Sequence, residues 1–159
     1  RDTHVVDADT VLSAQTTRVP VQDGHTALLS IALDTNPSID DVNEALASFR
    51  GPAEVADLPT APAAPIALVA GDDRPQPRLD VWASGGMTVT CGRVRGCPVL
   101  GYKLVALGHN TVRGAAGAAL LNAELLVRRE HRLRETAAEA ACSTNPPAHA
   151  PSPATLSPA

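Results

Sequence analysis

Between residues 11 and 50 the chain carries two strand-like segments followed by one helix-like segment, an order that strongly limits the possible folds. Residues 11–17 and 25–33 are rich in strand-forming side chains, and Asp23-Gly24 between them favours a turn. From Leu29 to Leu33 large apolar residues occupy every second position, as in a strand with one buried face. The fold is therefore expected to begin with two consecutive strands.

A helix is predicted over residues 38–50. Asn36-Pro37 ends the preceding strand, and Ser38 followed by Asp41 three positions later predicts a capping box. Gly51-Pro52 ends the helix. One face is apolar, with residues at helical spacing: Ile39, Val42, Leu46 and Phe49. The β-β-α order favours the α+β class, with a mixed, largely antiparallel sheet covered by helices.

Further strands are predicted at residues 66–69, 87–94 and 102–107, and a second long helix at 111–129. Residues 131–159 are rich in alanine and proline and offer no apolar pattern for a core, so this tail is expected to be disordered. Residues 1–107 then form the main domain, and residues 108–130 form a helix that closes it.

Composition narrows the classes of protein. The length of 159 residues suits one domain, and only 2% of the residues are aromatic, so the core must be aliphatic. The net charge of −4 and the lack of a basic run disfavour nucleic-acid binding. No apolar stretch approaches the roughly 20 residues that span a bilayer.

The cysteines and histidines argue against a disulfide framework or a metal site. The 3 cysteines and 5 histidines are scattered, without a compact cysteine pattern or an HExxH motif. Such cysteine use favours a reducing, cytoplasmic location. Because the chain begins at Arg1 rather than methionine, we expect it to be part of a larger protein.

Arg18 and His25 are the leading candidates for a site. A guanidinium binds a carboxylate through two parallel hydrogen bonds, and an imidazole titrates near neutral pH, where acid–base catalysis is most useful. The pair flanks the Asp23-Gly24 turn, which suits one anionic substrate. On spacing alone, a surface arginine and a structural histidine remain the alternative.

Asn110 and Thr111 open the second long helix, whose first turns carry glycine and alanine at 114–117. Small residues allow a cofactor to approach, and free N–H groups at a helix start attract polar or anionic groups. Tight packing of the helix against a sheet explains the same residues equally well.

Other polar residues are weaker candidates. Arg74, Arg78 and Arg93 either form an anion site or are solvated charges and interface ion pairs. Cys91 and Cys97 lie in or beside an apolar strand and are expected to act as small buried hydrophobic residues.

Three motifs, in the same order, resemble aspartate-semialdehyde dehydrogenases of the archaeal and fungal-like branch. Residues 18–25 resemble the family's substrate-binding segment. The other two motifs are Arg74–Asp80, with Gly86-Met87 and Gly92-Arg93 after it, and Leu104–Gly117, with Leu121–Leu125 after it. The resemblance extends from about Ser13 to Leu126.

The resemblance implies a catalytic and dimerising domain similar to the C-terminal domain of glyceraldehyde-3-phosphate dehydrogenase. The family's enzyme is a homodimer or homotetramer that reduces L-aspartyl-4-phosphate to L-aspartate 4-semialdehyde with NADPH, in lysine, threonine and methionine biosynthesis. It uses a cysteine nucleophile and a thioester.

Site roles follow from the same resemblance. Arg18 would bind the substrate's α-carboxylate, His25 would be the acid–base partner of the cysteine, and Asn110 with Thr111 would lie beside the nicotinamide of NADP. No cysteine here matches the nucleophile's motif, and the nucleotide-binding glycine loop is absent. The chain alone is therefore expected to be inactive, and its closing helix to pack on the absent nucleotide-binding domain.

Two alternatives stay open. A malonyl-CoA reductase shares this scaffold and thioester chemistry, and Arg18 would then bind the malonyl carboxylate. A non-catalytic dimerisation module would need neither Arg18 nor His25.

Overall fold

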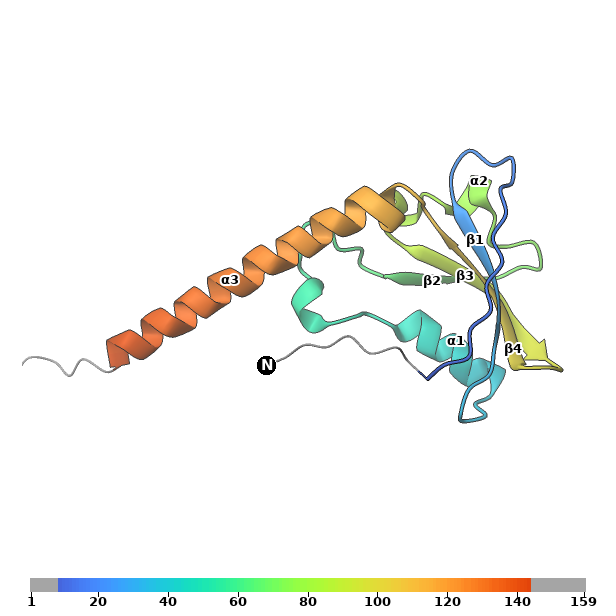
Figure 1. Ribbon diagram of the computed structural model, residues 1–159, viewed down its shortest axis with the longest axis horizontal. Coiled ribbons are helices and arrows are strands. Elements are labelled where there is room, and N and C mark those ends of the chain that lie inside the picture. The colour runs from blue at the N-terminus through green and yellow to red at the C-terminus, as the bar shows by residue number, and fades with distance from the viewer. Residues whose placement is uncertain (1–8, 144–159) are drawn as a thin grey trace, which may run out of the picture.

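A four-stranded sheet lies at the centre of residues 9–143, the part of the chain that the computed structural model describes (Figure 1). The strands are β1 (His25–Ile31), β2 (Ile66–Val69), β3 (Val89–Cys97) and β4 (Gly101–Gly108), in the order β1-β4-β3-β2. β4 pairs antiparallel with both β1 and β3, whereas β2 runs parallel to β3. The predicted mixed, largely antiparallel sheet is confirmed.

Within residues 9–143, three α-helices and three shorter helical segments complete the architecture. The α-helices are α1 (Ile39–Ser48), α2 (Pro77–Asp80) and α3 (Gly117–Ser143). The shorter segments are the 3₁₀-helices η1 (Ala53–Val55) and η2 (Ala83–Gly86) and the π-helix η3 (Val112–Ala116). The predicted capping box of α1 is present: Ser38 Oγ accepts from Asp41 N–H at 3.1 Å, and the Asp41 carboxylate accepts from Ser38 N–H at 2.8 Å.

The core is aliphatic, as the low aromatic content predicts. Leu107 of β4 is 1% exposed, and Leu58, Met87 and Leu121 form a cluster that connects the start of α3 to the body. The hydroxyl of Tyr102 donates to the Pro37 carbonyl at 2.6 Å, which ties the segment before α1 to β4. These contacts connect α1 and α3 to the same body of the protein.

Ion pairs and hydrogen bonds join α3 to the body as far as Arg132. Arg128 donates to the carbonyls of Glu54 and Asp57, each at 3.1 Å, and Arg129 and Arg132 form ion pairs with Glu54. Beyond these contacts the helix extends away from the sheet (Figure 1). Among the helices within residues 9–143, none is both long and apolar enough to cross a membrane.

Two expectations from the sequence are wrong. Residues 11–17 form no strand, because strand propensity alone does not supply a neighbouring strand to pair with. The tail that the sequence predicts to be disordered from residue 131 onward is helical as far as Ser143. The helix α3 therefore ends 14 residues after the predicted helix 111–129. The rest of the predicted tail, 144–159, lies outside the described residues.

Candidate functional site

The segment that precedes β1 folds over one end of the sheet and faces α2 (Figure 1). Residues 20–23 line a cavity of about 370 Å³, whose other wall is formed by Pro77, Arg78, Val81 and Trp82. Arg18 leads into this segment and His25 follows it, and both side chains are exposed. Neither is among the residues that line the cavity.

His25 and Asn110 lie at the same end of the sheet although 85 positions separate them in the sequence. His25 is the first residue of β1 and pairs with Gly108, the last residue of β4. One residue earlier, the Gly24 N–H donates to Asn110 Oδ1 at 2.9 Å. The structure therefore brings together two of the residues that the sequence singles out, with Thr111 directly after Asn110.

His109 is a residue of this site to which the sequence reasoning gave no role. Its side chain is 2% exposed, and its Nδ1 accepts from the N–H groups of Thr111 and Val112, each at 3.3 Å. Since Nδ1 accepts, the ring proton of the neutral imidazole lies on Nε2. Within residues 9–143, Nε2 has no hydrogen-bond partner.

The contacts of His109 remove one of the two reasons for expecting a ligand at the helix start, namely free backbone N–H groups. The N–H groups of Thr111 and Val112 are not free for an anion, because the imidazole accepts from them. The imidazole also meets the Trp82 indole edge to face, with ring centroids 4.2 Å apart. No local sequence signal could have shown this, since Trp82 comes from a distant segment.

Arg74 does not contribute to an open anion site. Its guanidinium forms two hydrogen bonds with the carboxylate of Asp80, which is 6% exposed and also accepts from Gln76 N–H at 2.7 Å. The hydrogen bonds from Arg74 hold the pKa of Asp80 below its usual value. Arg78 and Arg93 are exposed and lie outside this pair.

Cys91 and Cys97 are buried, as expected for small hydrophobic residues. Burial raises the pKa of the Cys91 thiol, which disfavours a reactive thiolate. Hydrogen bonding from the Leu100 N–H lowers the pKa of Cys97, but this residue ends β3 at the opposite end of the sheet from His25.

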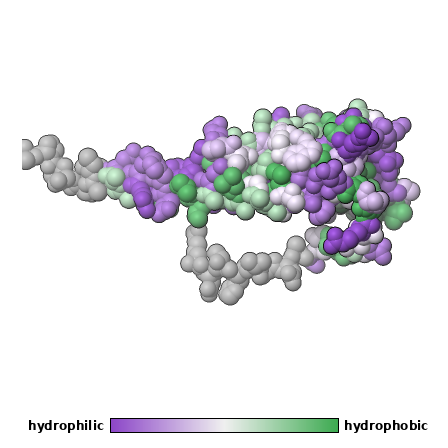
Figure 2. Space-filling view, turned by 90° about the horizontal axis from the view of Figure 1, so that it is seen from above, coloured by the Kyte–Doolittle hydropathy of each residue, from purple (hydrophilic) through white to green (hydrophobic). Residues whose placement is uncertain are grey.

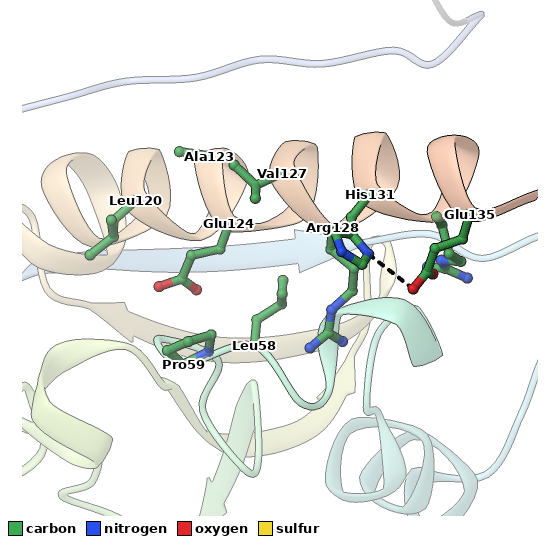
Figure 3. A pocket seen from close by; sticks show the side chains of 10 residues that line it. Leu58, Pro59, Leu120, Ala123, Glu124, Val127, Arg128, His131 and Glu135 are labelled. Atoms are coloured by element: carbon green, nitrogen blue, oxygen red, sulfur yellow. Dashed lines mark ion pairs between the residues drawn. The ribbon is translucent and has the colours of Figure 1, made fainter. Parts of the chain in front are cut away.

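A second hollow of about 760 Å³ runs along α3 (Figure 3). Leu58, Pro59, Leu120 and Val127 give it an apolar lining, and Arg128 and the His131–Glu135 ion pair lie at its charged end. On the face drawn in Figure 2, hydrophobic patches alternate with hydrophilic ones, and hydrophilic residues cover much of the outer part of α3.

Comparison with known families identifies the scaffold. Residues 1–113 match the family described as "Semialdehyde dehydrogenase, dimerisation domain", a range that includes Arg18, His25, Asn110 and Thr111. The chain belongs to that family. The sequence resemblance to aspartate-semialdehyde dehydrogenases is therefore confirmed, together with the expected α+β fold.

Individual relatives agree. The chain is 50% identical over 117 residues to the aspartate-semialdehyde dehydrogenase of Methanothermobacter thermautotrophicus, covering 72% of this chain and 34% of the relative. It is 46% identical over 121 residues to that of Archaeoglobus fulgidus, covering 76% and 34%. The chain thus spans about a third of the length of these relatives.

A solved structure shows the same fold. The aspartate semialdehyde dehydrogenase of Candida albicans, crystallised with NADP, superposes with a TM-score of 0.63 at 39% identity. The superposition covers 70% of this chain and 32% of that one. Most of this chain therefore has a fold that is found within a larger enzyme.

Proposed function

We propose that this chain is the catalytic and dimerising part of an NADP-dependent aspartate-semialdehyde dehydrogenase, and that it is inactive without the rest of that enzyme. The complete enzyme reduces L-aspartyl-4-phosphate to L-aspartate 4-semialdehyde. The observation that carries the proposal is the 46–50% identity to archaeal enzymes of that name.

Arg18 and His25 are the residues we assign to the substrate. Arg18 would bind the substrate's α-carboxylate through two parallel hydrogen bonds. His25 would be the acid–base partner of the cysteine nucleophile. Both side chains are exposed at the approach to and the start of β1, so a ligand can reach them. We assign the cysteine nucleophile to another part of the enzyme, because no cysteine of this chain matches the motif of the family's nucleophile.

Asn110 and Thr111 are the residues we assign to the cofactor. The residues after them, Gly114, Ala115 and Ala116, are exposed and small, which leaves room for a flat ring beside the Asn110 amide. This surface fits a nicotinamide. The reduced cofactor, NADPH, would supply the hydride that the reduction requires.

An assay of the complete enzyme tests the proposed function. Aspartate semialdehyde, phosphate and NADP⁺ together should produce NADPH, and omission of phosphate should abolish the reaction. A parallel assay with malonyl-CoA and NADPH distinguishes the rival reductase on the same scaffold. Turnover of malonyl-CoA, with none of aspartate semialdehyde, would reject our proposal.

Replacing Arg18 by lysine should mainly raise the Michaelis constant for aspartate semialdehyde in the complete enzyme. Lysine keeps the charge but cannot form the two parallel hydrogen bonds of a guanidinium. Binding of the substrate and of the transition state should therefore weaken by similar amounts. Steady-state kinetics over a range of substrate concentrations measure the change. Arg93→Lys is the matched control, since Arg93 is an exposed arginine outside the proposed site. An unchanged Michaelis constant in Arg18→Lys would remove Arg18 from the substrate site.

Self-association is expected through the exposed face of β1. Leu28 is 79% exposed, a large apolar surface for one side chain of the central sheet, whereas its neighbour Leu29 points to the opposite face of the strand. The family description names this part a dimerisation domain. Leu28→Asp should therefore shift the sedimentation coefficient toward the monomer. Leu133→Asp, on the extended part of α3, is the control, and an unshifted Leu28→Asp would place the interface elsewhere.

A further inference from the structure

The strand pair β1–β4 is extended past its last ladder residue by a side chain. The ladder ends where His25 of β1 pairs with Gly108 of β4. At the next position the Gly24 N–H donates to the Asn110 side chain, at 2.9 Å, rather than to a backbone carbonyl. The backbone directly before His25 is thus held by the residue that we assign to the nicotinamide.

Gly24 has little freedom to move away from this contact. Its φ of +109° is a conformation that other residues rarely adopt, and a Cβ there would lie 3.0 Å from Leu107 Cδ1 and 3.2 Å from Val81 Cγ2. Leu107 is 1% exposed and Val81 is 4% exposed, so the turn rests on the core. The Gly24 N–H therefore has a fixed direction, and Asn110 Oδ1 is the acceptor in that direction.

Asn110 is equally constrained from its own side. The buried ring of His109 accepts from the N–H groups that follow Asn110, and the His109 carbonyl accepts from Gly114 N–H at 2.9 Å. Because a backbone N–H can be met only by the oxygen of a carboxamide, the orientation of the Asn110 amide is fixed. Its NH₂ group has no hydrogen-bond partner within residues 9–143 and remains available to a ligand.

We propose that Asn110 is a positioning residue for His25. Its amide oxygen holds the Gly24 N–H and thereby sets where β1 presents the imidazole, while its NH₂ group contacts the nicotinamide. One side chain then couples cofactor binding to the placement of the acid–base group. The kinetic consequence rests on the function proposed above, whereas the hydrogen bond itself does not.

Two substitutions in the complete enzyme distinguish the role of the Asn110 amide oxygen from that of its NH₂ group. Asn110→Asp keeps an oxygen acceptor for Gly24 but loses the NH₂ donor, whereas Asn110→Leu has a similar shape and loses both. Asn110→Leu should lower kcat at saturating NADP about tenfold or more. Asn110→Asp should recover most of that loss and instead show a raised Michaelis constant for NADP.

A spectroscopic readout tests the hydrogen bond without any activity. Asp23-Gly24 is the sole Asp-Gly pair in these 159 residues, so labelling aspartate with carbonyl ¹³C and glycine with ¹⁵N selects the Gly24 amide of this chain. The Gly24 amide proton should be protected from exchange in the parent protein and in Asn110→Asp, and should exchange at least tenfold faster in Asn110→Leu. The cross-peak that disappears in Asp23→Asn, which removes this Asp-Gly pair, identifies the Gly24 signal within the complete enzyme.

The outcomes are distinguishable. Equal exchange rates of the Gly24 amide proton in the parent and in Asn110→Leu would overturn the proposal that the Asn110 side chain fixes the start of β1. A protected Gly24 with kcat as low in Asn110→Asp as in Asn110→Leu would overturn the role in positioning His25. If the complete protein does not reduce aspartyl phosphate at all, the proposed function fails, and the exchange experiment still decides whether Asn110 holds Gly24.

Discussion

In the complete enzyme, His25→Asn is expected to lower kcat by about 10² to 10⁴-fold, the usual contribution of a general acid–base. The imidazole is exposed at the first residue of β1, beside the Gly24–Asn110 hydrogen bond, and asparagine cannot transfer a proton near neutral pH. Steady-state kinetics at saturating aspartate semialdehyde and NADP measure the effect.

The fold should not change in His25→Asn, which separates a catalytic loss from a structural one. Substitutions of exposed residues away from special features usually alter the free energy of unfolding by no more than about 0.5 kcal/mol. Circular dichroism and the midpoint of thermal unfolding should therefore match those of the parent. A variant that folds normally and retains its kcat would show that the acid–base group is another residue.

Local signals in the sequence account for the elements that it predicts well. The capping box of α1 involves only Ser38 and Asp41, so the sequence carries all of its information. The alternation along 25–33 locates β1, although the buried face that it predicts is wrong, because no residue of β1 is buried; the short apolar run 66–69 coincides with β2. In each of these elements the pattern and its physical cause lie within a few residues.

Two other segments are predicted wrongly because the local apolar pattern does not contain the information that decides their structure. Residues 11–17 have strand-forming side chains but no neighbouring strand. Beyond residue 130, the loss of an apolar face obscures a helix that is supported instead by helix-forming alanine, glutamate and arginine. Ion pairs at i,i+4 spacing, Glu130–Arg134 and His131–Glu135, add to it. Weighing helix propensity beside the apolar pattern would have extended the predicted helix.

The candidate site shows the same division. Its members His25 and Asn110 are recognised from motifs, but the hydrogen bond that joins Gly24 to Asn110 spans 86 positions and follows only from the β1–β4 register. The burial of His109 and its contact with Trp82 likewise depend on how η2 lies against the end of β4. Sequence therefore indicates the chemistry, and the sheet decides which groups act together.

Gly92→Ala is expected to destabilise the fold by about 1–3 kcal/mol or more, the usual range for overpacking a filled interior. Gly92 lies in β3, between β2 and β4. A Cβ at this position would lie 2.8 Å from the Arg74 carbonyl oxygen and 3.1 Å from the Val69 carbonyl oxygen. Urea unfolding followed by circular dichroism measures the loss.

The surroundings of Gly92 cannot easily move to relieve this clash. The Val69 carbonyl belongs to β2, which pairs with β3, and Arg74 is held in place by its ion pair with the buried Asp80. Gly96→Ala in the same strand is the matched control, because a Cβ there meets no atom within 4 Å. The control should unfold at the parent's urea concentration or slightly above, since alanine restricts the unfolded chain more than glycine does. Equal midpoints for the two variants would mean that the loop carrying Arg74 yields, and that the Arg74–Asp80 pair does not anchor it against β3.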